Sequence, residues 1–445
     1  MSTQGCRGGL VNQLARQGRI IVKPPTLGST PASSPAESFV LDTTTPPQPH
    51  RMLVISALGV TQILAWGSSY YLLTILAKPI AAETGWPFAW VISGLSMGLL
   101  VSGVVSPQIG RAIERHGGRP VLMVSAALLA LGLLTLAAAS NIPTYLAGWL
   151  VIGLGMGAGL YEAAFSTLGR LYGLTARDAI ASLTLWGGFA ATVCWPLSAC
   201  LVQVVGWRAT CLAYAILQLA VAMPLYIFVL PHEKKRSSEA PVSHPEAAAT
   251  LGSPTSNRTL LVGMLGAILT TGGVIFSIWS VHIITILQGE GIALATAVAL
   301  GAIIGPAQVG ARAVEMAVGR YHHPLWTLVA SVTLIATGMV LLWVGFPMLT
   351  VSLLCYGAGS GIWSIARGTL PLALFGPLGY AALMGRLAMP SLIAQSLAPS
   401  LGAVLIEKGG SNGALAVLGI LSLVNVALVG GFGVCSRPLI FSAPE

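Results

Sequence analysis

Charge is scarce in this sequence. Asp, Glu, Lys and Arg make up 8% of the 445 residues, whereas 55% of the residues are hydrophobic. Charged residues form about a quarter of an ordinary soluble domain, so this composition excludes a soluble globular protein. A membrane protein is the class that it favours.

Cysteine is also rare, and the phosphate-binding motif of ATP-driven proteins is missing. The six cysteines form no Cys-x-x-Cys pair and no other metal-ligand spacing, which excludes a disulfide framework and a metal site. No GxxxxGK[ST] stretch occurs, so direct use of ATP is not expected. We expect neither a metal nor a cofactor.

Long apolar runs dominate what is present. Each is long enough to cross a bilayer as a helix, which takes about 20 residues, and too long for the strands of a membrane barrel. Because lipid admits only helices or closed barrels, the predicted fold class is an all-α polytopic membrane protein. The twelve predicted spans are 52–78, 87–109, 120–140, 143–169, 177–203, 208–230, 259–287, 291–311, 324–345, 347–375, 380–406 and 412–435.

Polar stretches divide the chain into parts. Residues 1–51 are rich in Ser, Thr, Pro and Gln and predict a disordered tail. Residues 231–258 predict a linker that divides the spans six and six, and 436–445 a short tail. The two membrane parts would therefore be 52–230 and 259–435.

The basic residues lie mostly on one side of the predicted membrane. Of the 22 lysines and arginines, eighteen fall in segments on one side, while Lys78, Arg208 and Lys408 fall on the other and Arg367 inside a span. By the positive-inside rule, both termini and the linker are predicted to be cytoplasmic. This topology accounts for the net charge of +9 without nucleic acid as a partner.

The two halves repeat each other. The stretch "SPQIGRAIERHGGR" from Ser106 returns with one inserted residue as "GPAQVGARAVEMAVGR" from Gly305. A second pair, "GMGAGLYEAAFSTL" from Gly155 and "GAGSGIWSIARGTL" from Gly357, lies at a constant shift of 202 residues. Internal repeats of this kind are typical of secondary transporters.

On these motifs the chain resembles the major facilitator superfamily, over residues 52–435. The superfamily's signature in the loop between helices 2 and 3 is matched by Gly110, Glu114, Arg115, Gly117 and Arg119, with Glu114 in place of the usual aspartate. The resemblance implies two pseudo-symmetric six-helix bundles, alternating access, and a monomer in a bacterial inner membrane.

The same resemblance implies that this loop stabilises the outward-facing state. The alternative is a plain cytoplasmic turn, but such a turn requires neither an acid nor glycines nor a second copy. The residues predicted to take part in gating are Gly110, Glu114, Arg115, Gly117 and Arg119 with their echo Gly310, Arg312, Glu315, Gly319 and Arg320, and also Glu162.

Glu162 and Arg367 are the acid and the base that the predicted spans place well inside the membrane. A charge there must face a cavity or a partner. Arg367 is either an anchor for an anionic solute or an inner-gate partner of an acid such as Glu315. Glu162 is either a proton site or, the favoured interpretation, a gate residue that pairs with Arg115 or Arg119.

Aromatic and amide side chains predict a pocket for a small organic molecule near the membrane midplane. Three of them follow at spacings of four and so share a face of the first span. The alternative for each is packing against other helices or lipid. The predicted solute-binding residues are Gln62, Trp66, Tyr70, Tyr161, Trp279, His282, Trp363 and Arg367.

The predicted function is secondary transport of a small organic anion such as a monocarboxylate, with the solute, a coupling proton or ion and the lipid bilayer as partners. The first alternative is export of amphiphilic compounds. The resemblance argues against a standard proton-driven drug exporter, because Trp149 stands where that class has an arginine and Trp195-Pro196 replaces its glycine-proline motif. A sensor would need a folded soluble domain, and an enzyme a nucleophile with a base; neither is evident.

Overall fold

The computed structural model describes residues 51–232 and 255–441, here called the N-half and the C-half. Every regular element in these ranges is a helix, which confirms the all-α class. Nine helical stretches in the described part of the chain are long and apolar enough to cross a membrane. One of them, Ile142–Phe228, has 87 residues and includes several helices, so the number of twelve spans stays a prediction.

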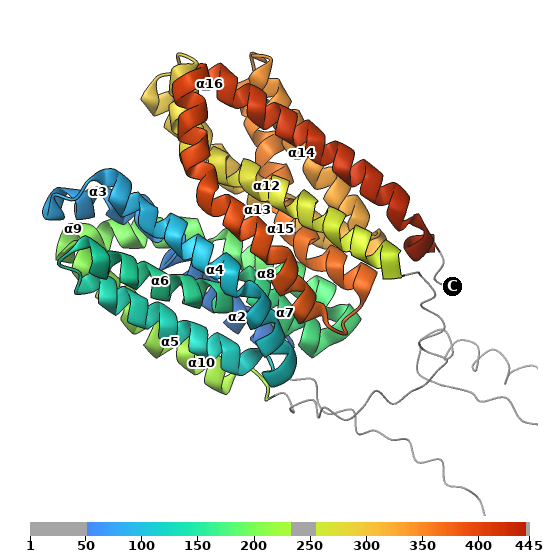
Figure 1. The fold of residues 1–445 in the computed structure, drawn as a ribbon, viewed down its shortest axis with the longest axis horizontal. Coiled ribbons are helices and arrows are strands. Elements are labelled where there is room, and N and C mark those ends of the chain that lie inside the picture. Colours follow the sequence, from blue (N-terminus) through green and yellow to red (C-terminus); the bar gives the residue numbers. More distant parts are fainter. Residues whose placement is uncertain (1–50, 233–254, 442–445) are drawn as a thin grey trace, which may run out of the picture. The chain divides into compact units, whose positions relative to one another are not determined.

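Figure 1 shows how the helices pack along one another. The helices of the N-half are α2 (Arg51–Gly67), α3 (Leu72–Thr84), α4 (Phe88–His116), α5 (Gly118–Ala137), α6 (Ile142–Gly159), α7 (Tyr161–Tyr172), α8 (Ala176–Gly188), α9 (Ala190–Leu217) and α10 (Met223–Phe228). Those of the C-half are α12 (Thr255–Gly289), α13 (Leu294–Val318), α14 (Pro324–Trp343), α15 (Leu349–Phe375) and α16 (Tyr380–Phe441).

Glycines break the helices between predicted spans. Gly206 in α9 and Gly410 in α16 have φ of 79° and 66°, a region that other residues rarely adopt. Gly117 ends α4 with φ 87° and ψ 166°. The backbone conformation at this position of the signature therefore favours glycine.

Helix boundaries differ from the predicted domain limits by a few residues. The first helix begins at Arg51, α12 begins at Thr255 inside the predicted linker, and α16 runs to Phe441 inside the predicted tail. The predicted limits follow the ends of the apolar runs, whereas a helix can continue past an apolar run while its backbone keeps helical dihedral angles. The rest of the predicted N-terminal tail and of the linker lies outside the described residues.

A break between α6 and α7 interrupts the predicted span 143–169. Leu160 has an extended backbone, with φ −77° and ψ −169°. The Gly159 carbonyl therefore has no partner in the helix, and the buried Gln62 side chain donates to it from Nε2 at 2.6 Å. The break places Tyr161 and Glu162 in the first turn of α7.

The halves meet through small residues at the end of the molecule that carries the arginine-rich turns. Helices α4 and α16 run side by side there (Figure 1). A side chain on Gly110 would strike the Ala381 carbonyl, and one on Gly385 would strike the Ser106 carbonyl. A buried apolar cluster continues across the junction, from Phe165 and Leu168 of α7 to Tyr380.

Candidate solute cavity

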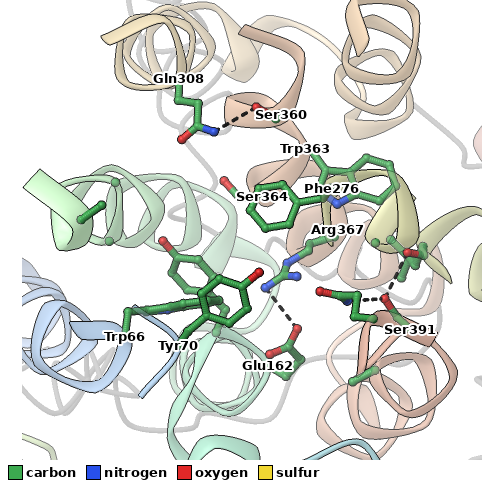
Figure 2. Close-up of a pocket in the computed structure, with 18 of the residues that line it drawn as sticks. Trp66, Tyr70, Glu162, Phe276, Gln308, Ser360, Trp363, Ser364, Arg367 and Ser391 are labelled. Atoms are coloured by element: carbon green, nitrogen blue, oxygen red, sulfur yellow. Dashed lines mark hydrogen bonds and ion pairs between the residues drawn. The ribbon is translucent and has the colours of Figure 1, made fainter. Parts of the chain in front are cut away.

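A cavity of about 170 Å³ lies between the halves. On the same measure a single water needs on the order of 10–15 Å³, so the space fits a small organic molecule. Five of the predicted solute-binding residues line it: Trp66, Tyr70, Tyr161, Trp363 and Arg367. Figure 2 shows several of these side chains pointing toward one another from both halves.

The N-half contributes an aromatic wall. The ring centroid of Trp66 lies 5.4 Å from that of Tyr70 and 5.2 Å from that of Tyr161. Tyr161 also stacks on Phe165 at 5.1 Å with an interplanar angle of 11°. Edge-to-face and offset contacts of this kind hold the rings in fixed orientations. The cavity therefore has a rigid apolar surface for the body of a solute.

Glu162 and Arg367 form an ion pair across the two halves. The Arg367 Nη2 and Glu162 Oε1 atoms are 3.1 Å apart, and the side chains are 20% and 18% exposed (Figure 2). The partial positive charge at the start of α7 also favours the carboxylate. Both residues line the cavity. The pair offsets the cost of two charges that are largely removed from water.

These contacts correct the predicted partners. Glu162 pairs with Arg367, not with Arg115 or Arg119. Glu315 does not reach Arg367; it lies 3.9 Å from Arg177 and 3.7 Å from His322. Sequence spacing alone could not predict these pairs, because they depend on how helices of the two halves face each other.

Arg312 is a second guanidinium in the cavity wall. Its side chain was expected at the cytoplasmic turn, but α13 continues to Val318 and the residue is only 7% exposed. Arg312 Nε donates to the Gly361 carbonyl at 3.1 Å, and Nη1 donates to the Thr184 carbonyl at 3.0 Å. Within the described residues, no carboxylate lies within ion-pair distance of it.

The C-half adds neutral polar groups that the sequence reasoning missed. Gln308 Nε2 donates to Ser360 Oγ at 3.0 Å (Figure 2). Gln395 Nε2 donates to Ser391 Oγ at 3.0 Å. Both pairs line the cavity, as does Ser364. Their signal in the sequence is the presence of Ser and Gln inside apolar spans, where polar side chains face the protein interior.

Three predicted solute-binding residues lie outside the cavity lining. Gln62 holds the break after α6. Trp279 is buried against Tyr356, with ring centroids 5.6 Å apart. His282 Nε2 donates to the Pro399 carbonyl at 2.8 Å. All three pack within their own half. Packing of this kind is the alternative to solute binding that the sequence analysis gave for each of them.

A polar cluster joins α8 to the turn after α13, where the echo of the signature lies. Arg177 Nη1 donates to the His322 carbonyl at 2.6 Å. Thr327 Oγ1 donates to Glu315 Oε1 at 2.7 Å, so the acid is held on several sides. Gly319 lies against the Glu315 carboxylate. We call Arg177, Glu315, His322 and Thr327 the inner clasp.

The signature residues near α4 are arranged differently from their echo. Arg170 donates to the main-chain carbonyl of Glu114, and Arg119 contacts the ring of His232. Arg115 is exposed at the end of α4. Arg320, in the echo, lies over the Tyr321 ring at 4.7 Å.

The two repeated glycines differ in their surroundings as well. A methyl group on Gly310 would point into open space, whereas one on Gly110 would strike α16. The close approach of two helices therefore requires glycine at the first position of the repeat and not at the second.

Known proteins resemble the chain in fold. The human organic anion transporter MFSD10 (TETRAN) superposes with a TM-score of 0.69 at 17% identity, covering 86% of this chain and 100% of that one. The proton:xylose symporter XylE bound to 6-bromo-6-deoxy-D-glucose gives a TM-score of 0.67 at 13% identity, covering 86% and 96%. No curated protein matches the chain.

The sequence profile of the Major Facilitator Superfamily matches residues 58–321, which is more than half of the chain. The match includes the signature at α4 and its echo in α13. Together with the apolar helices, it makes the chain a multi-pass membrane protein of a transporter family. The chain belongs to the Major Facilitator Superfamily.

Proposed function

We propose that the protein is a secondary transporter that moves a small organic anion across the membrane by alternating access. The observation that carries the proposal is the charge of the cavity lining. Two guanidiniums, Arg312 and Arg367, face it with one carboxylate, Glu162, which leaves a formal excess of one positive charge. The aromatic wall and the Ser and Gln side chains suit the body of an organic molecule.

Electrostatics favour an anion strongly in such a place. Two opposite unit charges 4 Å apart attract by about 4 kcal/mol at an effective dielectric constant of 20, against about 1 kcal/mol in water. An organic cation at the same distance would be repelled by the same energy. The charge of a solute is therefore expected to affect its binding more than its shape does.

The contacts between the halves support alternating access. Several of the described contacts that cross the halves lie near the arginine-rich turns: Gly110 with Ala381, Gly169 with Tyr380, and the inner clasp. We propose that this end is cytoplasmic, in line with the distribution of lysine and arginine, and that the structure is closed there. The inner membrane of a bacterium and a monomeric state are parts of the same proposal.

The test is uptake by the purified protein in liposomes. Labelled benzoate, a flat monoanion, is compared with benzamide, its neutral analogue of nearly the same shape. We expect benzoate uptake above that of protein-free liposomes, competition by unlabelled benzoate, and no competition by benzamide. Equal competition by both compounds would contradict an anion transporter. Repeating the assay with a proton gradient in each direction identifies a coupled proton.

Export of amphiphilic compounds is the second candidate, and the Glu162–Arg367 pair is the observation that favours it. The pair joins α7 to α15, so it can act as a gate that leaves the aromatic wall to bind the solute. Under this alternative, Arg367→Ala would change the transport rate but not the preference between benzoate and benzamide. Loss of that preference in Arg367→Ala would speak against it.

A further inference from the structure

We infer that Arg312 binds the anionic group of the solute, and that the Glu162–Arg367 pair tunes the cavity to a single negative charge. The inference rests on the proposed function and assigns its specificity to named residues. It predicts that monoanions are preferred to dianions. It also gives Arg312, which the sequence reasoning placed among the gating residues, the anchoring role that was considered there for Arg367.

The first step is the difference in partners between the two guanidiniums. Arg367 already has a counter-ion, because the Glu162 carboxylate lies 3.1 Å from it. In the described part of the chain, the hydrogen-bond partners of Arg312 are the neutral carbonyls of Gly361 and Thr184. A charged acceptor forms a stronger hydrogen bond with a guanidinium than a carbonyl does. An incoming carboxylate therefore gains most at Arg312.

The second step is the way in which Arg312 is held. Its Nε and Nη1 atoms are fixed by carbonyls of α15 and α8, so the orientation of the planar group is set before a solute arrives. Gly188 lets the guanidinium lie directly against the backbone of α8, where any side chain would strike Nη1. A pre-oriented guanidinium loses little conformational entropy when it binds a carboxylate.

The third step is the balance of charge. With Glu162 ionised, the lining carries one positive charge in excess, and a monoanion makes the filled cavity neutral. A dianion would leave one negative charge uncompensated in a site with little water, which is unfavourable. Replacing Glu162 with Gln would raise the excess to two positive charges. The same cavity should then accept a dianion.

The experiment compares benzoate with phthalate, which keeps the ring and adds a second carboxylate, at neutral pH in proteoliposomes. For Arg312→Gln we expect KM for benzoate to rise about ten- to one-hundredfold, the loss of a charge-assisted hydrogen bond. Arg312→Lys should recover part of the affinity, because it keeps the charge. Glu162→Gln should shift the preference toward phthalate by about tenfold or more.

The decisive variant is the double replacement Glu162→Gln with Arg367→Gln, which removes the internal pair and leaves the net charge unchanged. It should keep the preference for benzoate over both phthalate and benzamide, even at a lower rate. Binding is measured in parallel as the rise in Tm that benzoate causes in each purified variant, so a variant that folds but transports slowly is still informative.

Two results overturn the inference alone. One is a benzoate preference that persists in Arg312→Gln and disappears in the double variant, which would make Arg367 the anchor. The other is an unchanged ratio of phthalate to benzoate uptake in Glu162→Gln. A wild-type protein that neither binds nor takes up benzoate or phthalate would instead overturn the proposed function, and the inference with it.

Discussion

Glu162 and Arg367 come from opposite halves of the chain, and their charged atoms are 3.1 Å apart in the wall of the cavity. Both residues lie in segments that repeat each other in sequence, near the start of "YEAAFSTL" and within "WSIARGTL". The internal symmetry thus brings one acid and one base to face each other across the central cavity.

Replacement of Gly117 is expected to destabilise the protein, whereas replacement of Gly310 is not. Its backbone, with φ 87° and ψ 166°, lies in a region that is essentially restricted to glycine, so Gly117→Ala should cost about 1–3 kcal/mol of stability. Gly310 lies inside α13 with open space around it, so Gly310→Ala should be neutral or slightly stabilising. Thermal unfolding of the two purified variants measures the difference, and equal shifts in Tm would contradict it.

Gly110→Val is expected to keep the halves apart at the end where they meet. The new side chain would strike the Ala381 carbonyl of α16, so the closed arrangement of α4 and α16 becomes unfavourable. In a background without native cysteines, Ser364→Cys in the cavity should then react faster with a membrane-impermeant thiol reagent added from the side of the arginine-rich turns. Gly310→Val is the matched control. Labelling that rises equally in both would count against the assignment.

His323 should make the turn before α14 sensitive to acid. Burial, followed by the charges of Arg177 and His322, lowers the pKa of His323 below its usual value. Its neutral ring accepts a hydrogen bond from the Leu325 N–H and so caps α14.

Because the folded-state pKa is the lower one, the stability from neutral His323 is fully present above the unfolded value of about 6.5 and is lost as the pH falls below it. His323→Asn keeps a capping side chain and cannot titrate. Between pH 7 and pH 5, the Tm of the wild type should therefore fall more steeply than the Tm of this variant. Parallel curves would exclude His323 as the source.

Gln62 is expected to matter for stability although it does not line the cavity. Gln62→Leu would leave the Gly159 carbonyl without a donor at the break before α7, at a cost of about 1–3 kcal/mol. Because Glu162 follows directly after that break, KM for the solute should rise as well. Gln62→Glu fills the same volume without restoring the amide donor. A Gln62→Leu protein as stable as the wild type would show that the contact is dispensable.

The fold could be predicted from the sequence because lipid leaves few choices: long apolar runs must be helices, and a repeat with six runs in each half predicts two related bundles. Five of the eight solute-binding candidates line the cavity, namely Trp66 of α2, Tyr70 in the turn after α2, Tyr161 of α7, and Trp363 and Arg367 of α15. Arg367 and Glu162 could be placed at a cavity by the cost of burying charge, but their partners could not.

What the sequence could not reveal depends on geometry between helices. No proline announces the break at Leu160, so the role of Gln62 was hidden. The position of Arg312 depends on how far α13 continues beyond its apolar run. Gly110 and Gly310 are equivalent in the repeat, yet only Gly110 is packed tightly, because the two halves do not use the motif in the same way.

The contact between α4 and α16 includes glycines packed against main-chain carbonyls, while that between α8 and α13 includes the ion pair of Arg177 with Glu315. Smooth backbone surfaces can slide or separate without rotamer changes and without exposing unpaired ions. Opening should thus cost more free energy on the flank of α8 and α13 than on the flank of α4 and α16. Changes to a few polar side chains on the flank of α8 and α13 could therefore alter how fast the carrier cycles without changing the contact between α4 and α16.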